Sequence, residues 1–292
     1  MKRQLAILLA CTLLMGLARS VLVAETEADP PPPNQRKSEV QVKRDIAYFE
    51  GEGADRFKHK LDLYLPKGKS GFPVVLFVHG GALMTGDRNF FGVYEAVGKM
   101  FARNGIGAVV TSYRLSPGVL HPEHIKDVAR AVAWTHNNIH KYGGRTDQIF
   151  VCGHSAGGHL ISLLATDESY LKAEGLSLKD IKGAMPISGV YAIPNNLFNE
   201  VFGKDLEIRK KAGPLSQVCA ECPPFLIVYA DKDFPWCDKV SEEFAKALKA
   251  EKVPAETLSI KNRNHLDIIM KTAADADPCG QALLDFIAKH AE

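Results

Sequence analysis

The feature that most constrains this 292-residue chain is the stretch 148–160, which reads Q-I-F-V-C-G-H-S-A-G-G-H-L. A short apolar run leads into G-H-S-A-G, and a helical pattern then runs over residues 158–164. In a strand, G-x-S-x-G, helix arrangement, the two glycines permit a strained reversal that raises the serine hydroxyl above the strand ends. A serine hydroxyl is a weak nucleophile without a neighbouring base, so Ser155 predicts a histidine and an acid later in the chain.

The bulk composition is that of a soluble globular protein. Hydrophobic residues make up 46% and charged residues 24% of the chain, and the formal net charge is +2. The length allows one large α/β domain or two small ones. There is no basic stripe with interleaved aromatic residues, which argues against nucleic-acid binding.

Residues 1–20 have the pattern of a secretory signal peptide. A positively charged start precedes an almost uninterrupted apolar run over residues 5–18, and residues 18–20 form a small-x-small cleavage site, with residue 24 as a later alternative. The apolar run is too short for a transmembrane helix. We therefore expect a secreted or periplasmic protein, with no stable membrane insertion of the mature chain.

The remaining N-terminal features bear on anchoring and on domain boundaries. The apolar stretch continues beyond Cys11, which argues against lipoprotein cleavage at that cysteine. Residues 21–37 contain four consecutive prolines and are predicted to be a disordered spacer. Residues 38–292 are predicted to form a single domain.

Removal of the signal would leave five cysteines. Cys152 directly precedes the G-x-S-x-G turn and is interpreted as a buried apolar filler. Cys219-x-x-Cys222 has the spacing of a metal or redox site, but no second Cys/His pair accompanies it, so a zinc site is not favoured. In an oxidising compartment the other four cysteines could form disulfides, but the sequence does not determine their pairing. These are Cys219, Cys222, Cys237 and Cys279.

Apolar strands alternate with amphipathic helices along the chain, which predicts an α/β fold with a mostly parallel sheet, right-handed crossovers and helices on both faces. Residues 60–66 alternate and are predicted to be a half-buried strand. The irregular segment 191–218 is predicted to be a small cap or insertion. Strands are expected over 38–50, 60–66, 73–78, 106–113, 149–152, 181–190, 224–230 and 255–261, and helices over 92–104, 122–142, 158–164, 236–251 and 279–290.

The partners of the serine are sought at the carboxyl ends of the strands, where the chemistry of such a sheet gathers. Asp231 and Asp233 follow the seventh expected strand, and His265 follows the last. The order Ser155, Asp233, His265 is a serine, acid, histidine order in which the histidine takes the serine proton and the acid orients the histidine. Asp233 is preferred to Asp231 by its distance from the strand end, and the other histidines are interpreted as surface or packing residues.

Acyl transfer also needs hydrogen-bond donors aimed at the developing oxyanion. The N–H of Ala156, directly after the serine, is one predicted donor. H-G-G-A follows the third expected strand, and we expect Gly81 and Ala82 to supply the others, with Gly80 as a further candidate. His79 is predicted to brace this loop. No nucleotide-binding glycine motif is present, which argues against a nucleotide site.

With these residues assembled, the chain resembles the α/β-hydrolase superfamily, in its H-G-G-motif esterase and lipase-like branch. That branch includes hormone-sensitive-lipase-like enzymes, feruloyl and acetyl-xylan esterases, arylformamidases and prenylcysteine methylesterases. Ala82 and Leu83 depart from the glycine and tryptophan that many members carry. The likeness runs from about residue 60 to the C-terminus and rests on L-D-L-Y-L-P (61–66), H-G-G-A (79–82), S-Y-R-L-S-P (112–117), G-H-S-A-G (153–157), D-K-D (231–233) and N-H (264–265).

The resemblance implies a serine carboxylesterase that hydrolyses a carboxylic ester through an acyl-enzyme, without a cofactor, but it does not name the ester. The expected export suggests a small-molecule or polysaccharide-linked ester as the substrate, and no metal site is predicted. An amide-type hydrolase, such as an arylformamidase or a peptidase, would use the same three residues. A non-catalytic binding protein on the same fold is a further alternative. It is disfavoured because the serine, acid and histidine positions are all filled.

Overall fold

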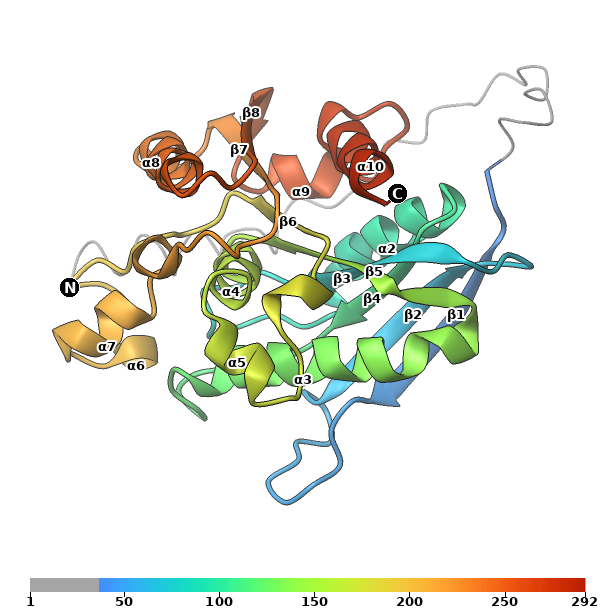
Figure 1. Ribbon diagram of the computed structural model, residues 1–292, viewed down its shortest axis with the longest axis horizontal. Coiled ribbons are helices and arrows are strands. Elements are labelled where there is room, and N and C mark those ends of the chain that lie inside the picture. The colour runs from blue at the N-terminus through green and yellow to red at the C-terminus, as the bar shows by residue number, and fades with distance from the viewer. Residues whose placement is uncertain (1–36, 292) are drawn as a thin grey trace. The chain divides into compact units, whose positions relative to one another are not determined.

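The computed structural model describes residues 37–291. They contain one eight-stranded sheet with the order β1-β2-β4-β3-β5-β6-β7-β8 (Figure 1). β1 and β2 run antiparallel to their neighbours, and every pair from β4 to β8 is parallel. The predicted signal peptide, Cys11 and nearly all of the predicted spacer lie outside the described residues.

The strands coincide with those expected, although several begin or end a few residues away. The largest difference is in β5, which begins well before its apolar run because its first residues still pair with β3. The strands are β1 Val40–Ala47, β2 Lys60–Pro66, β3 Phe72–Val78, β4 Gly107–Thr111, β5 Gly144–His154, β6 Gly183–Ile187, β7 Phe225–Lys232 and β8 Ala255–Asn264.

The helices divide between the two faces of the sheet, as the α/β prediction requires. The five expected helices are present, and the additional α5 and α9 are single short turns that give no recognisable periodicity in the sequence. The α-helices are α2 Val93–Arg103, α3 Glu123–Asn138, α4 Ala156–Leu164, α5 Glu168–Lys172, α6 Asn199–Phe202, α7 Leu206–Lys211, α8 Cys237–Ala250, α9 Asp267–Lys271 and α10 Pro278–His290. Short 3-10 helices are η3 Phe90–Gly92, η4 Ile139–Tyr142, η5 Leu178–Asp180 and η6 Pro214–Gln217.

Two apolar cores cover the sheet. Alternate residues of β3 face opposite sides, so that Leu76 belongs to the core that includes residues of α3, α4 and α8, whereas Phe77 belongs to the core that includes residues of α2 and α10. In Figure 1, α3 and α4 accordingly lie on one side of the central strands, and α2 lies behind them. Continuous apolar strands such as β3 are explained by this burial on both faces.

The prediction that β2 is half-buried is wrong. Leu61, Leu63 and Leu65 enter one core, but Asp62 and Tyr64 on the opposite face are also 0% exposed. The alternation of apolar and polar residues therefore does not mark a solvent face. It places a buried carboxylate inside the protein, where it needs a partner.

The cap predicted over residues 191–218 consists of α6, α7 and η6, and it is organised around a buried arginine. Arg209 on α7 is 1% exposed and has no carboxylate partner among its hydrogen bonds. Its guanidinium instead donates to the carbonyl oxygens of Pro194, Leu197 and Gly203 and to the side-chain oxygen of Asn199. Five donors in a planar fork suit this role, which lysine does not reproduce.

The cysteines of the described part of the chain are all free. Cys152 is fully buried on β5, as its interpretation as an apolar filler predicts. The thiols of Cys219 and Cys222 lie 3.4 Å apart. Within residues 37–291 no group of three His, Cys, Asp or Glu side chains is arranged to hold a metal ion. No helix in that part of the chain has the length and apolar character needed to cross a membrane.

Candidate active site

The predicted site residues all lie directly after the carboxyl ends of strands. The H-G-G-A loop, residues 79–88, follows β3, Ser155 follows β5, Asp233 follows β7, and His265 follows β8. Because β3, β5, β7 and β8 belong to the parallel part of the sheet, these ends lie at the same edge. Residues that are up to 186 positions apart in sequence, from 79 to 265, are thereby brought together.

Ser155 occupies a strained turn between β5 and α4. Its φ of 56° and ψ of −117° place a non-glycine residue in a region that costs about 1–3 kcal/mol. A Cβ atom built on Gly157 would lie 2.1 Å from the carbonyl oxygen of Val78, and one on Gly153 would lie 2.5 Å from the backbone of Gly157. Glycine is therefore required at both positions for β5, α4 and β3 to approach this closely. The Ser155 amide donates to the carbonyl oxygen of Ile187 on β6 at 2.8 Å, which holds the turn.

The structure brings Ser155, His265 and Asp233 into one hydrogen-bonded series. His265 Nε2 lies 2.9 Å from Ser155 Oγ, and His265 Nδ1 lies 2.7 Å from Asp233 Oδ1. A proton on Nδ1 that is donated to the carboxylate leaves Nε2 free to accept the serine proton. Asp231, the alternative acid, is exposed and accepts the amide of Arg263 instead, so it makes a loop contact and does not reach the histidine.

Asp233 is ionised over the ordinary pH range. Burial of its side chain acts to raise the pKa of this carboxyl, but hydrogen bonds from His265 and Ser188 outweigh burial and lower the pKa to about 2. Ser188 Oγ donates to Asp233 Oδ2 at 2.5 Å, and the Phe234 amide donates to Oδ1 at 2.8 Å. The carboxylate is therefore fixed from three sides with its charge directed at His265.

Two residues that support this series were not identified from the sequence. Ser188 directly follows β6, and no functional residue was predicted at the end of that strand. His154, interpreted as a surface or packing residue, is 3% exposed, and its Nε2 lies 2.8 Å from the carbonyl oxygen of His265. Burial lowers the pKa of His154 to about 3, so the neutral ring donates to this carbonyl and holds the backbone of His265. Its place inside the G-H-S-A-G motif was the only signal in the sequence.

The H-G-G-A loop lies against Ser155. A Cβ atom built on Gly80 would lie 3.2 Å from Ser155 Cβ. Gly81 has a φ of 117°, and a Cβ atom there would lie 2.0 Å from the carbonyl oxygen of Thr85. Only glycine therefore fits at position 81 in this turn. Ala82 and Leu83 continue the turn with φ of 55° and 62°. Consecutive left-handed non-glycine residues are unfavourable, so surrounding contacts must hold the loop.

The loop amides are not equally available. The Gly80 N–H donates to Tyr94 Oη at 3.0 Å, so the candidacy of Gly80 as an oxyanion donor does not fit the structure. Among the backbone hydrogen bonds of residues 37–291, none uses the N–H of Gly81 or Ala82. Ala156 is the first residue of α4, where an N–H has no partner inside the helix. The amides of Gly81, Ala82 and Ala156 are therefore available to bind an anionic oxygen.

His79 and Tyr113 support the loop from below. The two rings stack with centroids 4.3 Å apart and an interplanar angle of 10°, and Tyr113 Oη donates to the His79 carbonyl oxygen at 3.2 Å. Burial lowers the pKa of His79 to about 4, which keeps the ring neutral. His79 therefore lies beneath the loop, consistent with the bracing role expected of it.

A buried ion pair anchors the far end of the H-G-G-A loop. Arg88 Nε donates to Asp62 Oδ1 on β2 at 3.0 Å, and both side chains are almost completely buried. Arg88 also contacts Asp45 and the hydroxyl of Ser112, whose Oγ accepts the Arg88 amide at 3.0 Å. This contact explains the buried carboxylate in β2.

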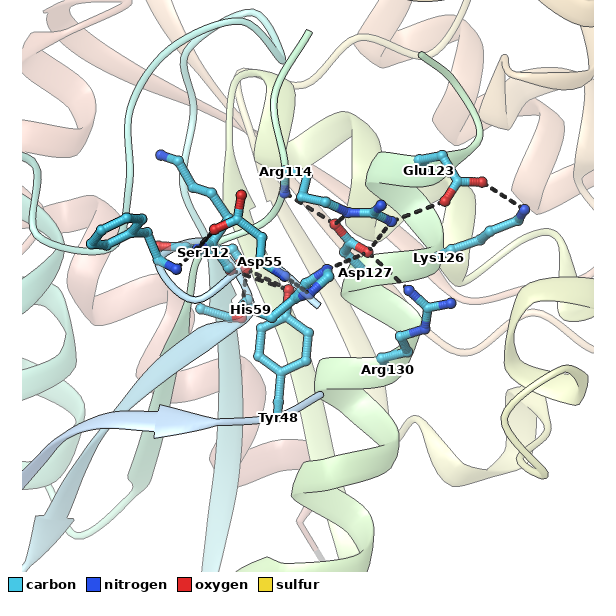
Figure 2. Close-up of polar contacts among 12 residues, drawn as sticks. Tyr48, Asp55, His59, Ser112, Arg114, Glu123, Lys126, Asp127 and Arg130 are labelled. Carbon is cyan, nitrogen blue, oxygen red and sulfur yellow. Dashed lines mark hydrogen bonds and ion pairs between the residues drawn. The ribbon is translucent and has the colours of Figure 1, made fainter. Parts of the chain in front are cut away.

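A second buried carboxylate, Asp127 on α3, anchors the segment after β4 (Figure 2). Arg114 makes a bidentate pair with it, each N–O distance being 2.8 Å, and a further bond links Arg114 to Glu123. Arg130 Nη1 lies 3.2 Å and His59 Nε2 lies 3.0 Å from Asp127 Oδ1. Burial acts to raise the pKa of Asp127, but hydrogen bonds from His59 and Arg114 keep it below its ordinary value.

The Asp127 network fixes the segment that touches the H-G-G-A loop. Arg114 directly follows Tyr113, whose ring supports His79, and the Ser116 amide donates to the Leu83 carbonyl oxygen at 2.9 Å. Leu83, which stands where many related enzymes have tryptophan, is itself 3% exposed and belongs to the core. It therefore packs inward and does not form a wall of an open pocket.

Comparison with known proteins identifies the fold. The BD-FAE family model matches residues 61–182. A carbohydrate esterase from gut microbiota, solved in a truncated form, superposes with a TM-score of 0.73 and 18% identity over 89% of this chain and 99% of that chain. A hyperthermophilic esterase from the archaeon Pyrobaculum calidifontis superposes with a TM-score of 0.69 and 21% identity over 88% of this chain and 86% of that chain. The chain has the α/β-hydrolase fold.

Curated relatives of this chain are named as esterases. Isoprenylcysteine alpha-carbonyl methylesterase ICME of Arabidopsis thaliana is 28% identical over 256 residues, which cover 79% of this chain and 58% of that protein. Esterase LipQ of Mycobacterium tuberculosis is 34% identical over 196 residues, which cover 61% of this chain and 46% of that protein. The chain thus spans about half the length of the curated relatives it matches. The expected fold is confirmed by the superpositions, and the names of the curated relatives agree with the expected resemblance to the esterase branch.

Proposed function

We propose that this α/β-hydrolase is a serine carboxylesterase that acts through a Ser155, His265 and Asp233 triad. The observation that carries the proposal is the hydrogen-bonded series from Ser155 Oγ through His265 to a carboxylate whose pKa is about 2. The names of the curated relatives and of the structural neighbours support an ester as the substrate.

The first half of the reaction follows from the geometry. Ser155 Oγ attacks the ester carbonyl carbon while its proton passes to His265 Nε2. The negative charge that develops on the carbonyl oxygen is bound by the amides of Gly81, Ala82 and Ala156, which are held in place before the substrate arrives. The carbon–oxygen bond to the alcohol then breaks, and His265 returns the proton to the departing oxygen, which leaves an acyl-enzyme.

The second half repeats the same steps with water. His265 Nε2 takes a proton from the water as it attacks the acyl carbon, and the same three amides bind the second oxyanion. Ser155 leaves with the proton from His265, which releases the carboxylic acid. Asp233 stays ionised throughout and stabilises the imidazolium form of His265 in each half.

The substrate proposal covers small-molecule esters and esters linked to a polysaccharide. The chain is similar in fold to a carbohydrate esterase, which favours the second class, and export would bring the enzyme to such substrates. Export itself is part of the proposal and has its own test. N-terminal sequencing of the protein recovered outside the cytoplasm is expected to begin near residue 21 or 25, and a start at Met1 would contradict it.

The proposed function is tested by covalent labelling together with turnover. Incubation with a fluorophosphonate is expected to modify Ser155, as identified by peptide mass spectrometry, and to abolish hydrolysis of p-nitrophenyl acetate in proportion to the label. His265→Ala is expected to label far more slowly because no base activates the hydroxyl. A control variant, His136→Ala on the outer side of α3, is expected to label normally. Labelling that spares Ser155, or an intact protein that cleaves amides but no ester, would overturn the proposal.

A further inference from the structure

Two aromatic side chains stand exposed beside His265. Phe234 and Trp236 lie in the short loop between β7 and α8 and are 38% and 39% exposed. The loop is packed down at both ends, because the Asp233 side chain is 2% exposed and Cys237 is 1% exposed. Phe234 and Trp236 are therefore exposed in a loop that is anchored at both ends, and Pro235 between them is exposed as well.

The rings form a stepped aromatic surface that starts at the histidine. The Phe234 ring lies 4.4 Å from the His265 ring, centroid to centroid, with an interplanar angle of 40°. The Trp236 ring lies 5.9 Å from Phe234 and is nearly parallel to it, at 17°. The Phe234 amide donates to Asp233 at 2.8 Å, which ties the start of this surface to the proposed acid.

The position of the surface decides which part of a substrate it meets. In the proposed reaction His265 Nε2 delivers a proton to the oxygen of the departing alcohol, so the alcohol must lie next to His265. The carbonyl oxygen points to the other side, towards the amides of Gly81, Ala82 and Ala156. A flat apolar face that adjoins His265 therefore contacts the alcohol part of the ester rather than its oxyanion.

We propose that Phe234 and Trp236 form an alcohol-side subsite that binds an aromatic ring of the departing alcohol. The inference rests on the proposed esterase function and adds a substrate class to it: esters of alcohols that carry an aryl ring. Offset stacking against two exposed and nearly parallel rings is the arrangement that aromatic groups prefer. A stacking contribution of this kind corresponds to about a tenfold effect on kcat/KM for each ring.

The test compares two acetate esters that differ only in the alcohol. Benzyl acetate and ethyl acetate have the same acyl group, and both release an alkoxide from a primary alcohol. Trp236→Ala is expected to lower the ratio of kcat/KM for benzyl acetate to that for ethyl acetate about tenfold. Trp236→Phe keeps an aromatic face and is expected to retain most of the ratio. Phe57→Leu removes a 65% exposed aromatic ring elsewhere and is the matched control, with no expected change.

A second ester pair separates the two sides of the site. Ethyl phenylacetate carries the ring on the acyl side, and its kcat/KM relative to ethyl acetate is expected to be unchanged in Trp236→Ala. A benzyl-to-ethyl ratio that survives Trp236→Ala, or a loss confined to ethyl phenylacetate, would overturn the subsite while leaving the esterase intact. If the unaltered protein hydrolyses none of the three esters, the proposed function fails and the subsite fails with it.

Discussion

The nucleophile turn and the H-G-G-A loop meet at the same catalytic position but are held in different ways. The turn around Ser155 is fixed by close backbone packing, in which Gly153 and Gly157 leave no room for a Cβ atom. The H-G-G-A loop is fixed at a distance by two buried carboxylates, Asp62 and Asp127, each bound by arginine. The first arrangement is steric and local, whereas the second is electrostatic and long-range.

Substitutions in the two regions are therefore expected to have different effects. A change in the turn is expected to act on the reaction directly, since Ser155 is the proposed nucleophile and the turn packs against backbone atoms of β3. A change in the carboxylate networks acts through the stability and placement of a strained loop. The predictions below separate these effects, from the largest to the smallest.

Removal of the nucleophile should have the largest effect, on activity alone. Ser155→Ala is expected to lower kcat for p-nitrophenyl acetate by on the order of 10⁶, because no other group can form the acyl-enzyme. Its unfolding free energy should stay close to that of the unaltered protein, since alanine adopts the same strained backbone. Ser155→Gly should be equally inactive but about 1 kcal/mol more stable, because glycine relieves the strain. Steady-state kinetics and urea unfolding measure both quantities, and residual turnover within tenfold would contradict the assignment.

Breaking the second carboxylate network should act on stability first. Asp127→Ala leaves Arg114, Arg130 and His59 without their shared partner, and loss of one member of a buried pair costs about 3–5 kcal/mol. The matched control is Asp147→Ala, which removes the exposed Arg145–Asp147 pair and is expected to cost less than about 1 kcal/mol. Equal losses in the two variants, measured by denaturant unfolding, would show that the buried network does not carry the loop.

The sequence was sufficient for features that depend on short patterns. The strand, turn and helix around Ser155 could be predicted because its glycine requirement is local, and His265 because it directly follows the last apolar strand. The resemblance to the α/β-hydrolase superfamily rested in part on the order of these residues. The parallel sheet could be predicted because continuous apolar strands alternate with amphipathic helices along the chain.

Features that depend on distant partners could not be predicted. Asp62 alternates with leucines as a surface residue would, and only Arg88, 26 positions later, shows that it is buried. Nothing near Ser188 in the sequence indicates that its hydroxyl reaches Asp233, 45 positions away. The Gly80 amide donates to the hydroxyl of Tyr94 on α2, and nothing near Gly80 in the sequence indicates this contact either. These residues take their roles from hydrogen bonds and ion pairs with other strands, helices and loops, and a single sequence contains no pattern that reveals such contacts.

Replacing the glycine in the turn of the H-G-G-A loop is expected to lower kcat. Gly81→Ala would place a Cβ atom 2.0 Å from the Thr85 carbonyl oxygen, so the turn must shift and its amides lose their alignment. Loss of one oxyanion donor lowers kcat by about 10²–10³. Gly68 also has a positive φ, of 72°, but no atom lies within 4 Å of a Cβ atom added there. Gly68→Ala is therefore the control that introduces backbone strain without a steric clash. If Gly68→Ala and Gly81→Ala lower kcat equally, misalignment of the oxyanion donors is not the cause.

The smallest expected effect is the pH dependence contributed by Asp233. Its pKa is lowered from 3.8 to about 2 in the folded protein, so its ionised form stabilises the fold at pH values above about 4. That contribution is lost as the pH falls from about 4 through 2, and the shift corresponds to about 2 kcal/mol. The difference in unfolding free energy between the unaltered protein and Asp233→Asn should therefore shrink by this amount between pH 5 and pH 2. Asp231→Asn, at an exposed carboxylate that does not touch His265, should retain the unaltered profile. A difference that is the same at both pH values would mean that His265 and Ser188 do not stabilise the ionised form of Asp233.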